Sequence, residues 1–304
     1  MTDIETLLQA LPYIRRHKKA TLVVKCGGEI ARDPGALASL AQDVALCSHV
    51  GIRTVVIHGG GPQATDLSRK LGVEPNIIQG RRVTDDATLE VAKMVFAGQI
   101  NIDILGALRS HGLRPVGLSG VDGEVIHAVK RPHTEMEDPD TGETRSVDFG
   151  HVGDITEVDT HLLTKLLDDG YVPVLASLGA DAEGRIYNIN ADTVAARIAM
   201  DMQADKLILL TNAPGLLTDP DDPASLVSHV SAARAEAMLG EGGIRGGMVP
   251  KITTLIQAVR GGVGRAHILD GKQPHSLLLE LFTREGTGTM VTTSAEEKRY
   301  LHDE

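Results

Sequence analysis

The chain has 304 residues, enough for one large domain or two lobes with an ample core. Its 30 basic and 41 acidic residues give a net charge of −11, which argues against nucleic acid as the main partner. Aromatic residues make up only 2% of the chain and tryptophan is absent, which also argues against base-stacking surfaces.

The apolar residues are spread along the chain, and no run of about 18 of them is present, so we expect no membrane span. Residues 1–21 lack the continuous apolar stretch and the small-residue cleavage site of a signal peptide. The two cysteines, Cys26 and Cys47, are expected to be reduced thiols. These features together predict a cytoplasmic protein.

The first predicted element is an amphipathic helix. Its apolar residues recur at helical spacing, and they are Ile4, Leu7, Leu8, Leu11 and Ile14. Pro12 within this pattern predicts a kink or a break. The helix precedes the first strand and has no place in an alternating fold. We therefore expect residues 1–20 to form an arm that packs on another subunit.

From residue 21 onward, strand and helix patterns alternate. Apolar and β-branched runs predict strands at 22–25, 53–58, 114–118, 172–177, 206–211 and 265–269. Helical patterns lie at 34–48, 62–71, 85–110, 159–167, 192–202, 232–238, 248–259 and 274–282. This alternation predicts an α/β fold with a central, mainly parallel sheet covered by helices on both faces, which is a three-layer αβα sandwich.

Residues 123–155 interrupt the alternation. Two strand-like segments, 124–130 and 145–151, flank a polar tip at 138–142 that is rich in turn residues. We expect an antiparallel excursion from the main sheet, placed like a lid over a site.

Glycine clusters follow the first two predicted strands. Lys25 and the pair Gly27 and Gly28 end the first strand, and three glycines at 59–61 end the second, with Pro62 next. Glycine lets backbone N–H groups approach an anion closely, and Pro62 suits the first turn of a helix, where free N–H groups and the helix dipole attract anions. In open α/β sheets, ligands bind at the carboxyl ends of the strands. The pattern predicts a phosphate site near Lys25.

Three other segments carry polar residues that are candidates for binding or catalysis. Asn188 and Asn190 alternate before Asp192, which is placed to cap the helix that follows. Lys251 lies in the first turn of a helix opened by a glycine pair, where a cation opposes the helix dipole unless an anion is nearby. Arg82 directly precedes a helix cap at Thr84 or Asp85, and its guanidinium could grip a carboxylate with two hydrogen bonds.

Several familiar motifs are missing from the sequence. No GxxxxGK[ST] sequence and no GxGxxG after a strand occur, which disfavours a Walker-type site and a dinucleotide site. His58 and the glycines after it resemble an esterase oxyanion loop, but no GxSxG accompanies them. Neither HExxH nor paired cysteines point to a resident metal.

Taken together, six segments resemble the amino-acid kinase family in order and in content. They are residues 24–28, 58–62, 80–84, 188–192, 246–251 and 286–290, and the resemblance covers the chain from about residue 21 to 291. It implies the family's αβα fold as a single domain over 21–304. An N-lobe at about 21–178 would bind the substrate and dimerise, and a C-lobe at about 179–304 would bind the nucleotide.

The closest resemblance is to the branch that phosphorylates the side-chain carboxylate of N-acetyl-L-glutamate in arginine biosynthesis. It implies ATP with Mg²⁺ as co-substrate and no tightly bound cofactor. Lys25, Lys251 and Asp192 would be the catalytic residues. The implied substrate-binding residues are Gly60, Gly61, Arg82, Asn188 and Asn190, and the implied nucleotide- and phosphate-binding residues are Gly27, Gly28, Thr211, Asn212, Gly215 and Gly247.

The N-terminal arm further resembles the arginine-inhibited branch, in which such arms join dimers into a ring-like hexamer. Tyr13, His267 and Glu280 match the positions that would bind the inhibitor arginine. Two alternatives stay open at this point. One is a sibling kinase for another acidic substrate, such as a carrier-linked aminoadipate, and the other is a non-catalytic arginine-sensing domain of the same fold. The presence of Lys25, Asp192 and Lys251 together favours an enzyme.

Overall fold

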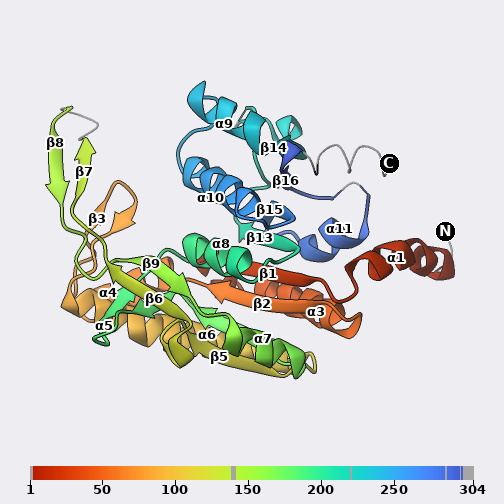
Figure 1. Ribbon diagram of the computed structural model, residues 1–304, viewed down its shortest axis with the longest axis horizontal. Coiled ribbons are helices and arrows are strands. Elements are labelled where there is room, and N and C mark those ends of the chain that lie inside the picture. Colours follow the sequence, from red (N-terminus) through yellow and green to blue (C-terminus); the bar gives the residue numbers. More distant parts are fainter. Residues whose placement is uncertain (1–2, 138–141, 220, 285, 295, 297–304) are drawn as a thin grey trace.

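The computed structural model describes residues 3–137, 142–219, 221–284, 286–294 and 296 (Figure 1). The main chain is organised around an eight-stranded sheet with the order β14-β16-β15-β13-β1-β2-β10-β5. Its strands are β1 (Thr21–Cys26), β2 (Arg53–His58), β5 (Pro115–Ser119), β10 (Val172–Ala176), β13 (Lys206–Thr211), β14 (His229–Ser231), β15 (Arg265–Asp270) and β16 (Thr289–Thr292). Neighbouring strands are parallel except β15 and β16. The predicted mainly parallel sheet is confirmed.

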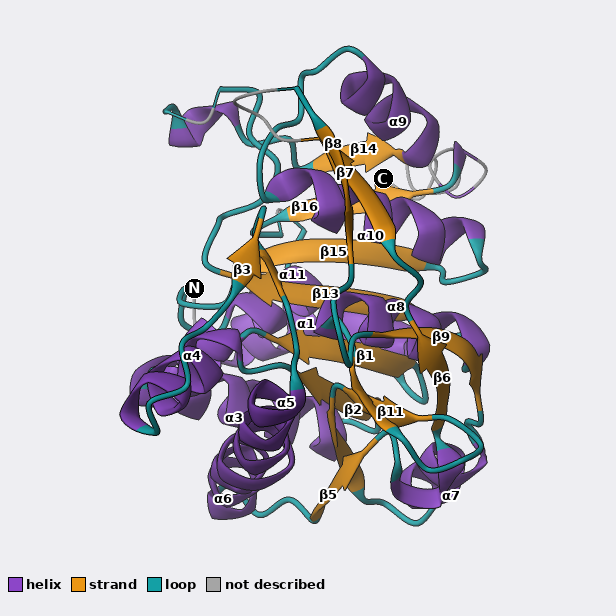
Figure 2. Ribbon diagram, turned by 90° about the vertical axis from the view of Figure 1, so that its left-hand side faces the viewer, coloured by secondary structure: helices purple, strands orange, loops and turns teal. Residues whose placement is uncertain are grey.

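Helices cover both faces of this sheet (Figure 2). One layer consists of α7 (His161–Asp168), α8 (Ala191–Asp201), α9 (Ala232–Gly240) and α10 (Met248–Arg260). The opposite layer includes α2 (Gly28–Arg32), α3 (Pro34–His49), α6 (Asn101–Ser110) and α11 (Ser276–Phe282). The remaining helical segments are α1 (Asp3–His17), α4 (Gly61–Lys70), α5 (Asp86–Ala92), η1 (Lys93–Ile100), η2 (Asp122–Glu124) and η3 (Pro223–Ser225). This arrangement is the predicted three-layer αβα sandwich.

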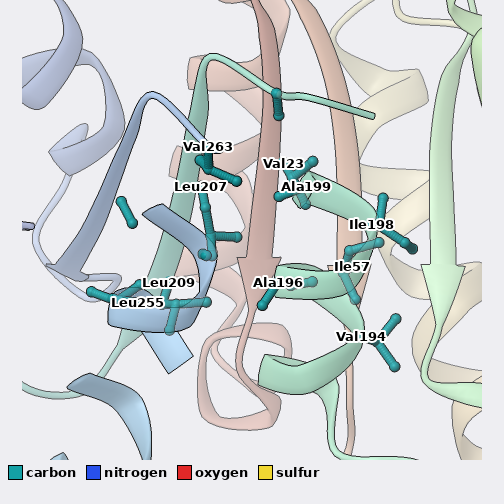
Figure 3. Close-up of a cluster of buried hydrophobic side chains, with 14 of the residues drawn as sticks. Val23, Ile57, Val194, Ala196, Ile198, Ala199, Leu207, Leu209, Leu255 and Val263 are labelled. Atoms are coloured by element: carbon teal, nitrogen blue, oxygen red, sulfur yellow. The ribbon is translucent and has the colours of Figure 1, made fainter. Parts of the chain in front are cut away.

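The two-residue alternation of the strands divides the core between the two faces. Val23 and Ile57 point toward α8, where they meet Val194 and Ile198 (Figure 3). Their neighbours Leu22 and Val24 point to the opposite layer. The same alternation places Lys25 on the α8 face and His58 on the α6 face, which decides the partners of both side chains.

The predicted helix at 85–110 is continuous but not uniform. It begins as α5, passes through the π-helical segment η1 and ends as α6. Asp85 is its N-cap and accepts a hydrogen bond from the Thr88 N–H at 2.8 Å. By length and composition this is the one described helix that could cross a membrane, yet it packs against β5 and β10 as a core helix does.

The excursion at 123–155 contains antiparallel strands, as predicted, but their pairing differs from the prediction. β6 (Ile126–Lys130) pairs with β9 (Gly153–Val158), whereas β7 (Thr134–Glu137) pairs with β8 (Thr144–Val147). The expected partnership of 124–130 with 145–151 was therefore wrong, because the outer hairpin closes on itself. Residues 138–141 of the predicted tip lie outside the described residues.

A smaller sheet, of order β12-β11-β6-β9, joins this excursion to the body through β11 (Leu178–Ala180) and β12 (Ile186–Asn188). The short hairpin of β3 (Ile77–Ile78) and β4 (Arg81–Arg82) lies beside the β7–β8 hairpin, where Gln79 Nε2 donates to the Glu137 carbonyl at 2.6 Å. Both hairpins stand at the end of the molecule away from α1 (Figure 1).

The N-terminal segment forms the predicted helix, α1, which continues through Pro12. Of the predicted kink or break at Pro12, the break is therefore wrong. The side chains of Ile4 and Leu7 lie outside the described part of the structure. At the end of α1, His17 is buried and its Nε2 lies 3.1 Å from the Leu281 carbonyl of α11. The arm is thus anchored at its C-terminal end, while Leu8 is 60% exposed.

Candidate active site

A cavity of about 490 Å³ lies where β1 and β2 end and α8 and α10 begin. Its size falls within the range of small-molecule sites. Of the predicted site residues it brings together Lys25, Gly28, Gly60, Gly61, Arg82, Asn188, Asn190, Asp192 and Lys251. Segments from both predicted lobes meet in this one cavity.

Asp192 lies at the centre of a charged triad. Its Oδ1 forms an ion pair with Lys25 Nζ at 2.8 Å, and its Oδ2 accepts a hydrogen bond from Lys251 Nζ at 3.1 Å. Lys25 comes from β1, Asp192 from the first turn of α8, and Lys251 from the first turn of α10. The nearby carboxylate explains why a lysine is stable at the positive end of α10, as the sequence predicted.

The electrostatic state of the triad follows from its burial and its charges. The Asp192 side chain is only 13% exposed. Burial by itself raises the pKa of Asp192, but the charges of Lys25 and Lys251 outweigh burial and hold this pKa below its ordinary value. The carboxylate therefore stays ionised at neutral pH and keeps two ammonium groups together.

The predicted cap of α8 requires a correction. Asn190, not Asp192, is the N-cap, because its Oδ1 accepts from the N–H groups of Asp192 at 2.8 Å and Thr193 at 3.1 Å. An N-cap carboxylate would be occupied by the backbone. Since Asn190 takes that position, both oxygens of Asp192 are available to the two lysines.

The glycine turns allow a ligand to come close to the backbone N–H groups. A Cβ atom on Gly60 would lie 2.2 Å from Ile100 Cδ1 and 2.8 Å from Phe96 Cδ1, both on η1. A Cβ atom on Gly28 would lie 2.9 Å from Pro62 Cδ. Within the described chain, the Gly60 N–H donates no hydrogen bond to protein. This N–H, beside the free first-turn N–H groups of α4, is suited to an anion.

Arg82 lies on β4 at the rim of the cavity. Its Nη2 donates to the Gly61 carbonyl at 3.1 Å and to Thr65 Oγ1, whereas its buried Nη1 has no hydrogen-bond partner among the described residues. Burial lowers the pKa of Arg82, although a guanidinium remains charged. A buried donor without a partner is costly, so Arg82 Nη1 is suited to a carboxylate ligand.

Asn188 completes this side of the cavity. It ends β12, and its Nδ2 donates to Thr84 Oγ1 at 3.2 Å. Its own N–H donates to the His151 carbonyl at 2.8 Å, which ties it to the segment after β8. The predicted substrate residues Arg82 and Asn188 therefore approach the cavity from separate strands.

The other predicted phosphate and nucleotide residues do not line this cavity. Gly27 caps α2 close to Lys25, and Gly247 caps α10. Thr211 ends β13, and its Oγ1 accepts from the Ala213 N–H at 3.1 Å. Gly215, at φ +152°, packs its Cα side against Thr289, and the exposed Asn212 lies between them in sequence. Gly27 follows β1, the residues from Thr211 to Gly215 end or follow β13, and Gly247 opens α10, on the same edge of the sheet.

The residues predicted to bind arginine lie in a different part of the fold. His267 Nδ1 is 2.7 Å from Glu280 Oε1, and Glu280 Oε2 accepts from the Thr287 N–H at 2.8 Å. Lys206 Nζ is 3.5 Å from His267 Nε2, and burial is the main cause that lowers the pKa of Lys206 to about 8. Tyr13 lies on α1, half-buried. The structure brings His267 and Glu280 together and adds Lys206, which the sequence did not single out.

Several further side chains of the cavity were missed by the sequence reasoning, and three of them stand out by their charge, size or position. They are Arg131, whose guanidinium pairs with Asp154 at 2.7 Å, Phe96 on η1, and Ser177 after β10. Only the position of Ser177 at the carboxyl end of a strand offered a signal. Among the described residues, no cluster of three or more acidic, histidine or cysteine side chains could hold a metal ion.

Comparison with known proteins identifies relatives that cover nearly the whole chain. The model of the amino acid kinase family matches residues 20–270. The chain is 48% identical to the acetylglutamate kinase of Symbiobacterium thermophilum, over 94% of this chain and 96% of the relative. It is 44% identical to the acetylglutamate kinase of Methanothermobacter thermautotrophicus, over 96% and 100% respectively.

Solved structures show the same fold. An N-acetylglutamate synthase from Neisseria gonorrhoeae, complexed with coenzyme A and N-acetyl-glutamate, superposes with a TM-score of 0.81 at 32% identity. The match covers 97% of this chain but 64% of the synthase chain. A carbamate kinase from Giardia shares the fold alone, with a TM-score of 0.60 at 17% identity. The six sequence segments, the αβα sandwich and the family match agree, and the chain belongs to the amino acid kinase family.

Proposed function

We propose that this kinase transfers the γ-phosphoryl group of ATP to the side-chain carboxylate of N-acetyl-L-glutamate. The observation that carries the proposal is the Lys25–Asp192–Lys251 triad, which lies beside the glycine turns in a cavity that also holds Arg82. The relatives named acetylglutamate kinase, at 41–48% identity over nearly the whole chain, support the choice of acceptor. The product is an acyl phosphate for arginine biosynthesis.

The reaction needs positioning and charge more than it needs proton transfer. A carboxylate oxygen of the acceptor forms a bond to the γ-phosphorus while the bond from that phosphorus to the β,γ-bridging oxygen breaks, and ADP leaves. The acceptor is already an anion, so no general base is required. Two anions must approach each other, and cations with oriented N–H groups reduce their repulsion.

In this proposal each side of the cavity has its own role. Lys25 and Lys251 stabilise charge on the transferring phosphoryl group, and Asp192 orients both. Gly60 and Gly61 present N–H groups to the acceptor and to the phosphoryl oxygens. Arg82 uses its unpartnered Nη1 to hold the α-carboxylate of the substrate.

Two asparagines complete the acceptor side. Asn188 fixes the acetylamino end of the substrate, and Asn190 supports the site as the N-cap of α8. The phosphate path runs along Gly27 and Gly28.

The nucleotide is assigned to the neighbouring edge of the C-terminal half. Thr211, Asn212 and Gly215 follow β13, and Gly247 opens α10 next to Lys251. Mg²⁺ arrives with the phosphates of ATP, because both Asp192 oxygens are engaged by lysines and the cavity offers no other carboxylate among its described walls. The ion neutralises phosphate charge when bound.

We also infer inhibition by arginine at the cluster of His267 and Glu280, with Tyr13 on the arm. A second N-acetylglutamate synthase structure, 29% identical to this chain and with a TM-score of 0.78, is a complex with coenzyme A and L-arginine. The anchoring of α1 on α11 supports a link between arm and cluster. The arm would join homodimers into a homohexamer of a cytoplasmic enzyme.

One assay separates this proposal from its alternatives. ADP production is measured with ATP, Mg²⁺ and N-acetylglutamate, and in parallel with glutamate, aspartate, carbamate and an aminoadipate derivative. Among these acceptors, we expect turnover only with N-acetylglutamate. Turnover with another acidic substrate instead would indicate a sibling kinase. Arginine binding without any turnover would indicate a sensor.

A further inference from the structure

The side chain of His58, which opens the sequence motif His58-Gly59-Gly60-Gly61, has no part in the reaction as proposed. His58 ends β2 and is completely buried on the α6 face of the sheet. Its Nδ1 lies 3.1 Å from the Gly59 carbonyl, and its Nε2 lies 3.1 Å from Asn101 Nδ2. The imidazole is therefore held at both ends, between the glycine turn and the start of α6.

The partners of Asn101 determine how its carboxamide is oriented. Asn101 is 3% exposed, and its Nδ2 donates to the carbonyls of Val174 at 3.1 Å and Leu118 at 3.3 Å. Carbonyl oxygens only accept, so the amide nitrogen rather than the oxygen must face them. The same nitrogen lies 3.1 Å from His58 Nε2, so its two hydrogens are shared among three acceptors. An amide nitrogen cannot accept a hydrogen bond, so His58 Nε2 must be the unprotonated nitrogen.

The other end of the imidazole gives the same answer. The Gly59 carbonyl can only accept, so His58 Nδ1 must carry the proton. Burial lowers the pKa of His58 to about 4, so the ring is neutral at pH 7 and has a single proton to place. Both contacts select the tautomer with hydrogen on Nδ1.

The space for Asn101 is provided by a glycine on β5. A Cβ atom on Gly117 would lie 2.1 Å from Asn101 Oδ1, and therefore a larger residue would displace the carboxamide. Asn101 also directly follows η1, whose Phe96 and Ile100 pack against Gly60. The π-helical segment thus packs directly against Gly60, and Asn101, the residue after it, contacts the His58 ring that precedes the glycine turn.

The hydrogen bond to Gly59 acts on the amide that follows. The C=O and N–H of one trans peptide point in opposite directions, so holding the Gly59 carbonyl toward His58 turns the Gly60 N–H away from it. This N–H has no protein acceptor among the described residues, and Gly60 is one of the residues that line the cavity.

We propose that Asn101 is a positioning residue for phosphoryl transfer: it keeps the proton of His58 on Nδ1, and His58 thereby sets the peptide plane that presents the Gly60 N–H. The inference rests on the proposed role of Gly60 in binding the acceptor. Neither Asn101 nor His58 touches the reacting atoms.

The tautomer is tested first, without substrate. The protein contains 12 histidines, and His58 is assigned by the signal lost in His58→Gln on ¹⁵N-histidine labelling. We expect a neutral ring with the proton on Nδ1 in the unsubstituted protein. Asn101→Asp replaces a donor by an acceptor, so we expect the proton on Nε2 or a charged ring. A neutral ring protonated on Nε2 in the unsubstituted protein would overturn the inference.

The effect on turnover is tested with a matched pair of variants. The amide nitrogen of asparagine reaches about the place of Nδ1, whereas that of glutamine reaches about the place of Nε2. We expect His58→Asn to keep kcat within about threefold, and His58→Gln and Asn101→Leu to lower it by about 10- to 100-fold. The KM for ATP should stay within about twofold in all three.

The double variant separates the proposed positioning role from a purely structural one, and the results expected for the positioning role are these. Adding Asn101→Leu to His58→Asn should lower kcat no further, because no tautomer is left to select, and kcat should not track Tm across the variants. Thr54→Val is the control, since Thr54 is buried on the same strand and face, and its hydroxyl has no partner among the described residues. Equal losses in His58→Asn and His58→Gln would contradict the proposal. If the unsubstituted protein does not phosphorylate N-acetylglutamate, the proposed function fails, while the labelling result still decides the tautomer.

Discussion

Replacing either lysine of the triad by methionine is the sharpest test of the catalytic assignment. Methionine keeps the length of the side chain and removes its charge. In Lys25→Met and Lys251→Met, Asp192 keeps one partner, so the carboxylate is not left buried and alone. The substitution therefore removes one cation from the phosphoryl site with little change in shape.

The size of the effect follows from burial and distance. At an effective dielectric of about 20, unit charges about 4 Å apart interact by about 4 kcal/mol. Loss of one donor to a developing oxyanion costs about 3–4 kcal/mol in other enzymes. We expect about 2–4 kcal/mol, or about a 30- to 1000-fold fall in kcat. The Lys25 side chain is 12% exposed and that of Lys251 is 25% exposed, so Lys25→Met should lie nearer the upper end.

The assay is ADP production at saturating ATP and N-acetylglutamate, with circular dichroism and Tm as checks of folding. Lys93→Met is the control, because Lys93 pairs with Glu90 on a helix surface at 2.6 Å. It should change kcat less than twofold. If both triad variants keep kcat within about threefold of the unsubstituted enzyme, the lysines do not stabilise the transferring phosphoryl group and the reasoning is refuted.

Four further predictions concern the acceptor site, the core and the arm. Arg82→Lys loses the planar fork at its buried donor, so the KM for N-acetylglutamate should rise by about 10- to 100-fold at an unchanged KM for ATP; equal rises in both would argue against a carboxylate contact. Gly60→Ala places a methyl group against Ile100 and should abolish substrate binding in calorimetry, with partial recovery in Gly60→Ala/Ile100→Val. His58 and His267 have pKa values lowered to about 4, chiefly by burial, against about 6.5 when unfolded, so the unfolded state binds more protons between these values. The free energy of unfolding should therefore fall as pH drops from 6.5 to 4, and His267→Gln should show a shallower fall in urea titrations. Deletion of residues 1–16 should leave a dimer in sedimentation and weaken arginine inhibition; an unchanged oligomer would count against the arm model.

Much of the fold was predictable because it depends on local patterns. Buried parallel strands are continuous apolar runs, and the strands at 53–58 and 206–211 match their predicted bounds. The strands β14 and β16 were missed, since three or four residues carry too little periodicity. The pairing of β6 was mistaken because the outer hairpin has the same alternation as the inner one.

The candidate site was predictable where backbone geometry demands a particular residue. Glycine turns and a lysine at the start of a helix both indicate an anion-binding site. The sequence favoured Asp192 as the helix cap, although asparagine and aspartate are equally common N-cap residues. Only the position of the first helical turn shows that the cap is Asn190. The contact between His58 and Asn101 could not be predicted, since it joins residues 43 positions apart through the packing of a helix on a sheet.

The pairing of β1 with β13 has a mechanical consequence. Five residues of β1 are in register with β13, and the opposite edge of β1 pairs with β2. The half of the chain that would hold the acceptor and the half that would hold the nucleotide therefore share one continuous sheet instead of a linker. Bringing donor and acceptor together must change the twist of this sheet, not swing a hinge. Lys25 lies on the strand about which that twist would turn, so it should move least while the two ligands converge.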